Sequence, residues 1–141
     1  MFTPTRAEVR RFFRAAWRKQ SEGVPLEPIE AIAADIVSVH PEVHGLLAAD
    51  SNAEAGSVDT SADADDGGAF LHLSLHLAVR EQISIDQPPG IRAQYERLAA
   101  RSGAHPAFHA IMECLGRTLH EAQTAGTGPD GQAYLERISR L

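Results

Sequence analysis

Cysteine, long apolar runs and an excess of positive charge are all missing from this sequence. Its single cysteine, Cys114, cannot form a disulfide within the chain, which favours a reducing, cytoplasmic setting. No apolar run approaches the ~18 residues of a membrane-spanning helix, and the N-terminal segment lacks the apolar stretch of a signal peptide. Since 19 acidic residues outnumber 13 basic ones, the net charge is −6 and nucleic-acid binding is not expected. We therefore expect a cytoplasmic protein without a transmembrane segment.

The length of 141 residues suits one domain, residues 1–141, with a hydrophobic core of its own. Residues 50–68 stand apart, because they carry six acidic residues, no basic residue, and mostly alanine, serine and glycine otherwise. A segment of this composition cannot bury enough apolar surface to order itself. It is therefore predicted to be a disordered, flexible acidic loop.

A basic amphipathic helix is predicted from about Thr5, since Thr5 and Glu8 have the spacing of a capping box. Apolar residues then recur at helical spacing: Val9, Phe12, Phe13, Ala16 and Trp17. The other face carries six of the basic residues: Arg6, Arg10, Arg11, Arg14, Arg18 and Lys19. An anionic membrane surface would suit this face, but we favour a core-packed helix whose basic face is solvated and partly balanced by the acidic loop.

Helical periodicity predicts further helices over residues 28–39, 69–85 and 90–101, another beginning at Pro106, and a last one that carries Tyr134. The segment 69–85 begins with leucines alternating with polar residues, as in a strand, but its length and the DQPPG stop favour a helix. Five to six helices with short connections indicate an all-α protein, an antiparallel helical bundle.

Within the helix over residues 69–85, leucines occur on both sides, which predicts an element buried nearly all round. The polar exceptions Arg80, Glu81 and Ser84 are expected to point away from His72 and His76. Two histidines in such an apolar segment need partners, because an unpaired buried polar group costs roughly 1–3 kcal/mol.

Pairs of potential ligands recur at i, i+4 spacing, which places both side chains on one helix face. They are His40 with His44, His72 with His76, and His109 with Glu113. This is the geometry with which an H-E-x-x-H helix holds zinc. We therefore predict a metal site formed by these six residues. A hydrogen-bonded network with water, or a solvent-filled cleft, would satisfy the imidazoles equally well and stays open at this point.

The ligand chemistry narrows the choice of ion. Imidazoles dominate the set and Glu113 is its single carboxylate, so the hard cations Mg²⁺ and Ca²⁺ are disfavoured. Such a set suits Zn²⁺, Fe²⁺, Ni²⁺ or Cu²⁺, with zinc or iron as first choices. No organic cofactor is expected, since no glycine-rich phosphate loop occurs. Cys114 lies off the histidine stripe in mid-helix and is interpreted as a packing residue.

Five segments of the sequence resemble a family of small bacterial proteins, the domain of unknown function 1841. They are FTPTRAEVRRFF, HPEVH, FLHLSLHLAVREQISIDQPPGIR, HAIMECLG and YLERI. The resemblance covers nearly the whole chain except the acidic loop. The resemblance implies one compact domain. It implies no particular activity, because none is established for the family. It extends to His40, His44, His72, His76, His109 and Glu113, whereas the family often has tryptophan where His120 stands, so His120 is left out of the ligand set.

Two functions of different classes follow. The first is a helical bundle that binds a transition-metal ion at its histidine-rich site. The alternative is a non-enzymatic helical interaction module with packed or hydrogen-bonded histidines and no metal, which meets a partner protein or a second copy of itself. No reaction or substrate follows from these residues.

Overall fold

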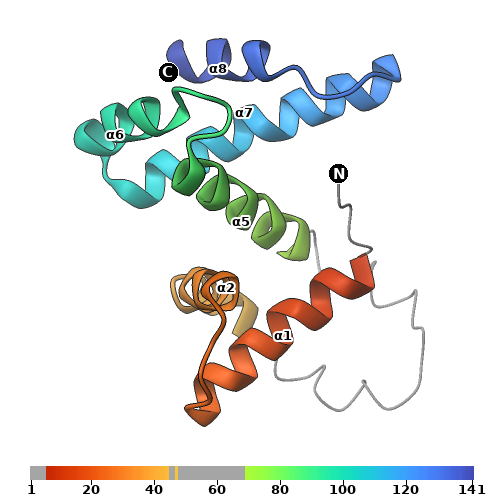
Figure 1. The fold of residues 1–141 in the computed structure, drawn as a ribbon, viewed down its shortest axis with the longest axis vertical. Helices are drawn as coiled ribbons and strands as arrows, with labels where there is room; N and C mark the ends of the chain where they lie inside the picture. The colour runs from red at the N-terminus through yellow and green to blue at the C-terminus, as the bar shows by residue number, and fades with distance from the viewer. Residues whose placement is uncertain (1–5, 45–46, 48–68) are drawn as a thin grey trace. The chain divides into compact units, whose positions relative to one another are not determined.

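The computed structural model describes residues 6–44, 47 and 69–141, and across them it holds six α-helices, one short 3₁₀ helix and no strand (Figure 1). The helices are α1 (Arg6–Glu22), α2 (Pro28–Ser38), α5 (Ala69–Ile85), α6 (Ile91–Ser102), α7 (Ala104–Ala125) and α8 (Gly131–Ser139), and the 3₁₀ helix η1 (Pro41–Val43) follows α2. The prediction of an all-α protein is therefore confirmed. Among the described residues, no helix has the length and apolar character that a membrane crossing needs.

The chain divides into two compact units, residues 1–74 and residues 75–141, with the boundary inside α5. We call them unit 1 and unit 2 and describe each by itself. A single domain over residues 1–141 stays a prediction. The predicted acidic loop, residues 50–68, and Thr5 of the predicted capping box lie outside the described residues.

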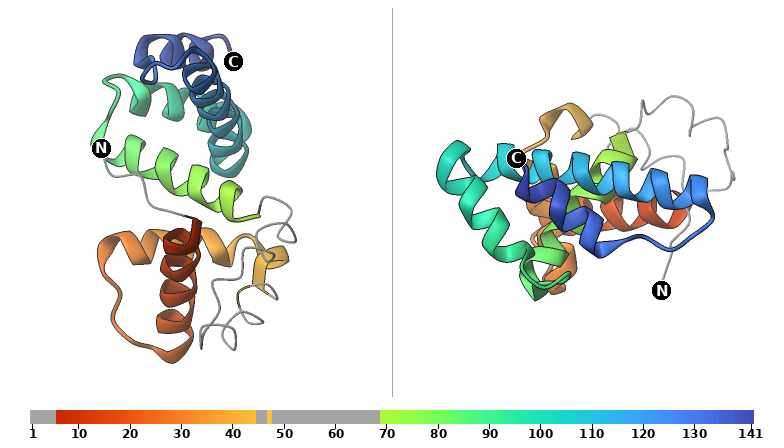
Figure 2. Two further views of the ribbon diagram at one scale, coloured as in Figure 1. Left: turned by 90° about the vertical axis from the view of Figure 1, so that its right-hand side faces the viewer. Right: turned by 90° about the horizontal axis from the view of Figure 1, so that it is seen from above.

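Unit 1 is built on α1 and α2, which cross rather than lie alongside each other in Figure 1 and in the left-hand view of Figure 2. The apolar stripe of α1 faces inward as the periodicity predicts, with Phe13 and Ala16 fully buried and Val9, Phe12 and Trp17 half-buried. From α2, Ile36 and Val37 are equally inaccessible. Burying the large side chains Phe13, Ile36 and Val37 stabilises the fold by about 1.5–3 kcal/mol each, and this holds α1 against α2.

The basic face of α1 is only partly solvated, which corrects the prediction. Arg10 is buried, and its Cζ lies 5.3 Å from the centroid of the Phe70 ring. Arg14 lies over the same ring at 5.9 Å. An arginine stacks well on an aromatic face because its guanidinium is planar and weakly hydrated. Helical periodicity shows that these arginines lie on the polar face of the helix. It cannot show that Phe70, which is distant in the sequence, packs against them.

Lys19 forms an ion pair with Glu30 that ties the end of α1 to the start of α2, with Nζ and Oε2 2.7 Å apart. The Glu27 backbone N–H also donates to Glu30, at 2.9 Å. The Lys19 hydrogen bond, followed by that backbone hydrogen bond, holds the pKa of Glu30 below its ordinary value. The charged carboxylate is therefore favoured by folding.

Glu30→Gln is expected to make the free energy of unfolding less dependent on pH. Because the pKa of Glu30 is lowered in the folded state, its contribution is present above the ordinary carboxyl pKa and is lost as the pH falls through the lowered value. Urea unfolding at several pH values from 6 down to 3 measures the free energy of unfolding of the variant and of wild type. The difference between the two should become smaller as the pH falls. Lys19→Met should have the same effect, and an unchanged pH dependence in both variants would contradict the assignment.

Unit 2 consists of the C-terminal part of α5 with α6, α7 and α8. Helix α7 packs against both α6 and α8, and α8 folds back over α7 after the turn at residues 126–130 (Figures 1 and 2). Each element contributes to one core, with Val79 from α5, Ile91 from α6, Ile111 from α7 and Ile138 from α8 all fully buried. Unit 2 thus has a hydrophobic core of its own, which fixes the facing sides of α5 and α7.

The connection between α5 and α6 is held by one carboxylate. Helix α6 has Gly90 as its N-cap, which offers no capping side chain. Asp86 takes that role, because its Oδ1 accepts from the backbone N–H of Gly90 at 3.1 Å and of Arg92 at 3.0 Å. These bonds satisfy donors that a helix start otherwise leaves without partners.

Helix α5 has the predicted bounds, but it is not buried all round. Leu71 near its start and Ile85 at its end are each 65% exposed, whereas Leu73 and Val79 are fully buried. The prediction of burial on every side is therefore wrong at both ends of the helix. Leucine on a helical wheel reports hydrophobicity alone, and an exposed leucine is common on folded proteins.

Candidate metal site

Three histidines of unit 2 lie together where α5 passes the start of α7: His76, His105 and His109. The ring centroids of His105 and His109 are 4.1 Å apart, and the His76 ring lies 5.6 Å and 5.4 Å from them. One ring nitrogen from each residue lies within 4.8 Å of the corresponding nitrogens of the others. His76 is buried, while His105 and His109 are partly exposed. The three imidazoles therefore converge on one point at the edge of the core.

His105 is absent from the predicted ligand set because α7 begins at Ala104, before the predicted start at Pro106. Proline is tolerated anywhere in the first turn of a helix, where its missing N–H would have no intrahelical acceptor. Gly103 precedes the helix with φ of 94°, and its carbonyl accepts from the Ala107 N–H at 3.2 Å. The earlier start places His105 on the same helix face as His109. The H-x-x-x-H spacing of the two residues in the sequence could have indicated this pair.

The arrangement is close to what a metal ion requires. Zinc–nitrogen bonds of about 2.0–2.1 Å at tetrahedral angles place the ligand nitrogens about 3.3 Å apart. The nitrogens here lie within 4.8 Å, so contraction by at most about 1.5 Å brings them into a coordination sphere. Small rotations about side-chain torsions supply a movement of this size. Within unit 2, three imidazoles thus supply three of the four ligands of a tetrahedral site.

The aromatic ring of Phe108 packs against His76. Its ring centroid lies 5.5 Å from that of His76, and Tyr95 stacks on it at 4.7 Å with an interplanar angle of 18°. Arg80 also lies over the Phe108 ring, with its Cζ 5.3 Å from the centroid. The prediction that Arg80 points away from His76 is therefore wrong, since both contact the same ring, as their i, i+4 spacing allows.

Within unit 1, His40 and His72 contact each other. The Nδ1–H of His40 donates to the Ile36 carbonyl at 2.7 Å, which leaves Nε2 as the acceptor in a neutral ring. That Nε2 lies 3.2 Å from Nε2 of His72. The backbone of α2 thus orients the His40 ring toward His72. Within unit 1 the His72 ring lies beside that of His40, and within unit 2 the His76 ring lies beside those of His105 and His109.

His44 uses a ring nitrogen locally. Its Nε2 lies 2.8 Å from the Val37 carbonyl oxygen, to which it donates. Its ring also stacks on Trp17 of α1, with centroids 4.4 Å apart and an interplanar angle of 28°. His44 therefore connects α1, α2 and the segment after η1. Among the described residues, the group of histidines whose ligand atoms converge does not include His44.

The remaining predicted ligand, Glu113, is exposed on α7, and the converging set over the described residues does not include it. His120 is also exposed and lies outside that set. Cys114 is buried, and this burial raises the pKa of its thiol, so it stays protonated at neutral pH. These positions agree with the interpretation of Cys114 as a packing residue.

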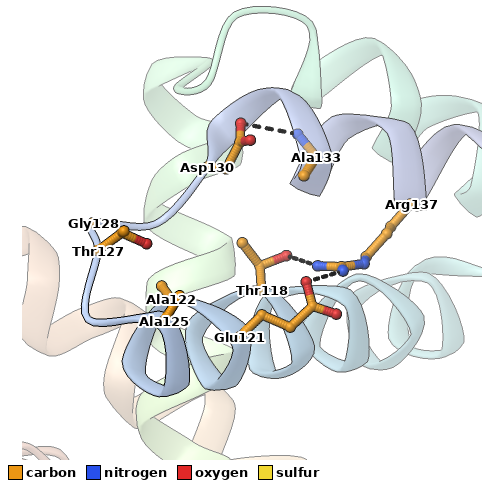
Figure 3. A pocket seen from close by; sticks show the side chains of 9 residues that line it. All are labelled: Thr118, Glu121, Ala122, Ala125, Thr127, Gly128, Asp130, Ala133 and Arg137. Carbon is orange, nitrogen blue, oxygen red and sulfur yellow. Dashed lines mark hydrogen bonds and ion pairs between the residues drawn. The ribbon is translucent and has the colours of Figure 1, made fainter.

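Unit 2 also holds a cleft of about 200 Å³ between α7, the turn after it and α8 (Figure 3). Arg137 crosses this cleft to donate to Thr118 at 2.8 Å and to pair with Glu121. Asp130 accepts from the backbone N–H groups of Gln132 and Ala133 as the N-cap of α8. The charged side chains of the cleft thus bind one another or the backbone, so their role is to hold α8 against α7.

The chain matches the model of a protein family described as "Domain of unknown function (DUF1841)", over residues 5–140. Neither the curated proteins nor the solved structures contain a match to the chain. The family description names no ligand and no reaction. A function for this protein therefore has to be argued from its side chains.

Proposed function

As the chain belongs to the DUF1841 family, whose description names no activity, we propose that the protein binds a transition-metal ion through His76, His105 and His109. The observation that carries this proposal is the convergence of three ring nitrogens within 4.8 Å of one another. These nitrogens come from two helices that share a core, so their positions do not depend on a mobile segment. Sites on packed helices hold ligands in place more accurately than sites on loops.

The donor set favours Zn²⁺ or Fe²⁺. Neutral imidazole is a borderline ligand that suits zinc, iron, nickel and copper, whereas Mg²⁺ and Ca²⁺ require oxygen ligands. Zinc accepts three imidazoles with a further ligand in tetrahedral geometry, and iron accepts them with several further positions occupied. The other sequence-predicted ligands stay predictions, and metal analysis of their alanine variants tests each one: His40, His44, His72 and Glu113.

Metal content of the isolated protein tests the proposal directly. Protein produced without an affinity tag should carry close to one zinc or iron per chain, with iron measured after anaerobic purification. Metal-free protein should regain one ion on titration, and its melting temperature should rise, because a ligand that binds only the folded state stabilises it by about 2.7 kcal/mol at 100 times its dissociation constant.

The opposite result would support the alternative of a metal-free interaction module. A protein isolated without metal, whose unfolding is unchanged by a chelator and by added Zn²⁺ or Fe²⁺, would contradict metal binding. Lower pH should weaken binding in the proposed case, because protons compete with the ion for the same nitrogen lone pairs.

A further inference from the structure

A glycine precedes α7 where many helices have a capping side chain. Gly103 is the N-cap residue, with φ of 94°, and glycine has no side chain that could accept from the first N–H groups of the helix. Its carbonyl accepts from the Ala107 N–H at 3.2 Å. Ala104 and Pro106 are exposed, so the burial of their apolar atoms adds little stability to this turn. A helix end of this kind opens locally more readily than the buried middle of the same helix.

The candidate metal site includes this turn. His105 is the second residue of α7 and His109 follows four residues later, so both rings lie on one helix face, with centroids 4.1 Å apart. The His76 ring, from α5, lies 5.6 Å from that of His105. An ion bound by these rings therefore ties the first turn of α7 to its second turn and to α5. This connection is the same whatever further ligands the ion has.

The first turn of α7 also supports an aromatic contact beside the site. In an α-helix each N–H donates to the carbonyl four residues earlier, so the N–H groups of residues 107–110 donate to residues 103–106. Phe108 is one of these donors, and its ring stacks on Tyr95 of α6 with centroids 4.7 Å apart. Opening of the first turn breaks these backbone hydrogen bonds and releases the backbone that holds the Phe108 ring in its stack. The surface formed by Phe108 and Tyr95 thus depends on whether the turn is closed.

We propose that metal binding regulates the start of α7, so that the ion closes the first turn and its loss allows residues 103–109 to open. This inference rests on the proposed metal binding. Closure and binding are then linked in both directions. An ion that binds the closed turn stabilises it, and a turn that is already closed binds the ion more tightly. The stack of Phe108 on Tyr95 forms with the ion and loosens without it, which makes this part of unit 2 responsive to metal.

Amide hydrogen exchange measured by NMR tests the opening of the turn. The amides of residues 107–110 report it because their acceptors lie within the turn. In metal-free protein they should exchange at least about tenfold faster than the amides of residues 112–115, which include buried core positions of the same helix. Added Zn²⁺ should slow the exchange of residues 107–110 by up to about 100-fold at 100 times its dissociation constant.

The affinity for Zn²⁺ tests the linkage from the other side, because the alanine at position 104 supplies no ligand atom. Ala104→Gly, which makes the first turn harder to order, should weaken Zn²⁺ binding by about two- to fivefold. Ala104→Pro should strengthen it by a similar factor, about two- to fivefold, because proline at the first helical position has the required φ in advance. Ala125→Gly makes the same change at the other end of α7 and should leave the affinity unchanged.

The results that would overturn the inference differ in what they say of the proposed function. If residues 107–110 exchange as slowly as residues 112–115 in metal-free protein, the turn is closed without the ion, and the inference fails while metal binding stands. Unchanged Zn²⁺ affinity in both Ala104 variants has the same meaning, as does an equal loss of affinity in Ala104→Gly and Ala125→Gly. A protein that takes up no Zn²⁺ contradicts both the inference and the proposed function.

Discussion

Replacing His109 with alanine is expected to lower the affinity of the protein for Zn²⁺ by at least about 100-fold, because changes outside the coordination sphere alone cost about 10–100-fold. His109 supplies one of three converging nitrogens, and its ring lies 4.1 Å from that of His105. It is partly exposed, so its truncation leaves little cavity, and alanine is the best helix former. Competition with a chromophoric chelator measures the affinity.

His120→Ala is the matched control for this variant. His120 is a histidine of the same helix, α7, but it is exposed and outside the converging set. The His120→Ala variant should bind Zn²⁺ with the same affinity as the wild-type protein. Far-ultraviolet circular dichroism should give the same helix content for both variants, which separates loss of a ligand from loss of the fold. Equal affinities in the two variants would mean that His109 is not a ligand.

Ile111→Ala is expected to lower the free energy of unfolding by about 2–5 kcal/mol, the range for truncating a large buried aliphatic side chain. Ile111 is fully buried in the core of unit 2, on the same helix as His105 and His109. The lost methyl groups leave a cavity that neighbouring helices fill only in part. Since small domains are stable by about 5–15 kcal/mol in total, this one change removes a large share.

Leu119→Ala provides the comparison on the same helix. Leu119 is 39% exposed, so its truncation should cost below about 1 kcal/mol. Urea unfolding followed by circular dichroism measures both variants. Saturating Zn²⁺ should restore part of the stability lost in Ile111→Ala, because the ion binds the folded helix pair. If the two variants lost equal stability, α7 would not be packed on the face that the structure assigns to it.

Helix positions followed well from the sequence because they depend on local signals. The bounds of α5 match the prediction, since the DQPPG stop acts within a few residues of the helix end. The start of α7 was predicted too late, because proline was assigned to the first helical position when the third is equally compatible. That small difference removed His105 from the predicted site.

The neighbours of each predicted ligand do not follow from the helix pattern, for a physical reason. An i, i+4 pair on one helix can bind one ion, and the spacing of His72 and His76 satisfies that rule. In the structure His72 instead bonds with His40, and His76 lies beside His105 and His109. Helical spacing shows which side chains share a face, and the neighbouring helix decides which of them meet.

The sequence by itself determined that this protein is all-α, where its helices lie, and that histidines are placed among apolar residues, because periodicity and end signals act over one or two turns. Only the tertiary structure decided which residues each histidine contacts. His40 contacts Ile36 and His72, and His44 contacts Trp17 and Val37. His76 contacts Phe108, whose ring also lies under Arg80. Three of these contacts join residues far apart in the chain: His40 with His72, Trp17 with His44, and His76 with Phe108. They follow from how helices pack, which local sequence patterns do not encode.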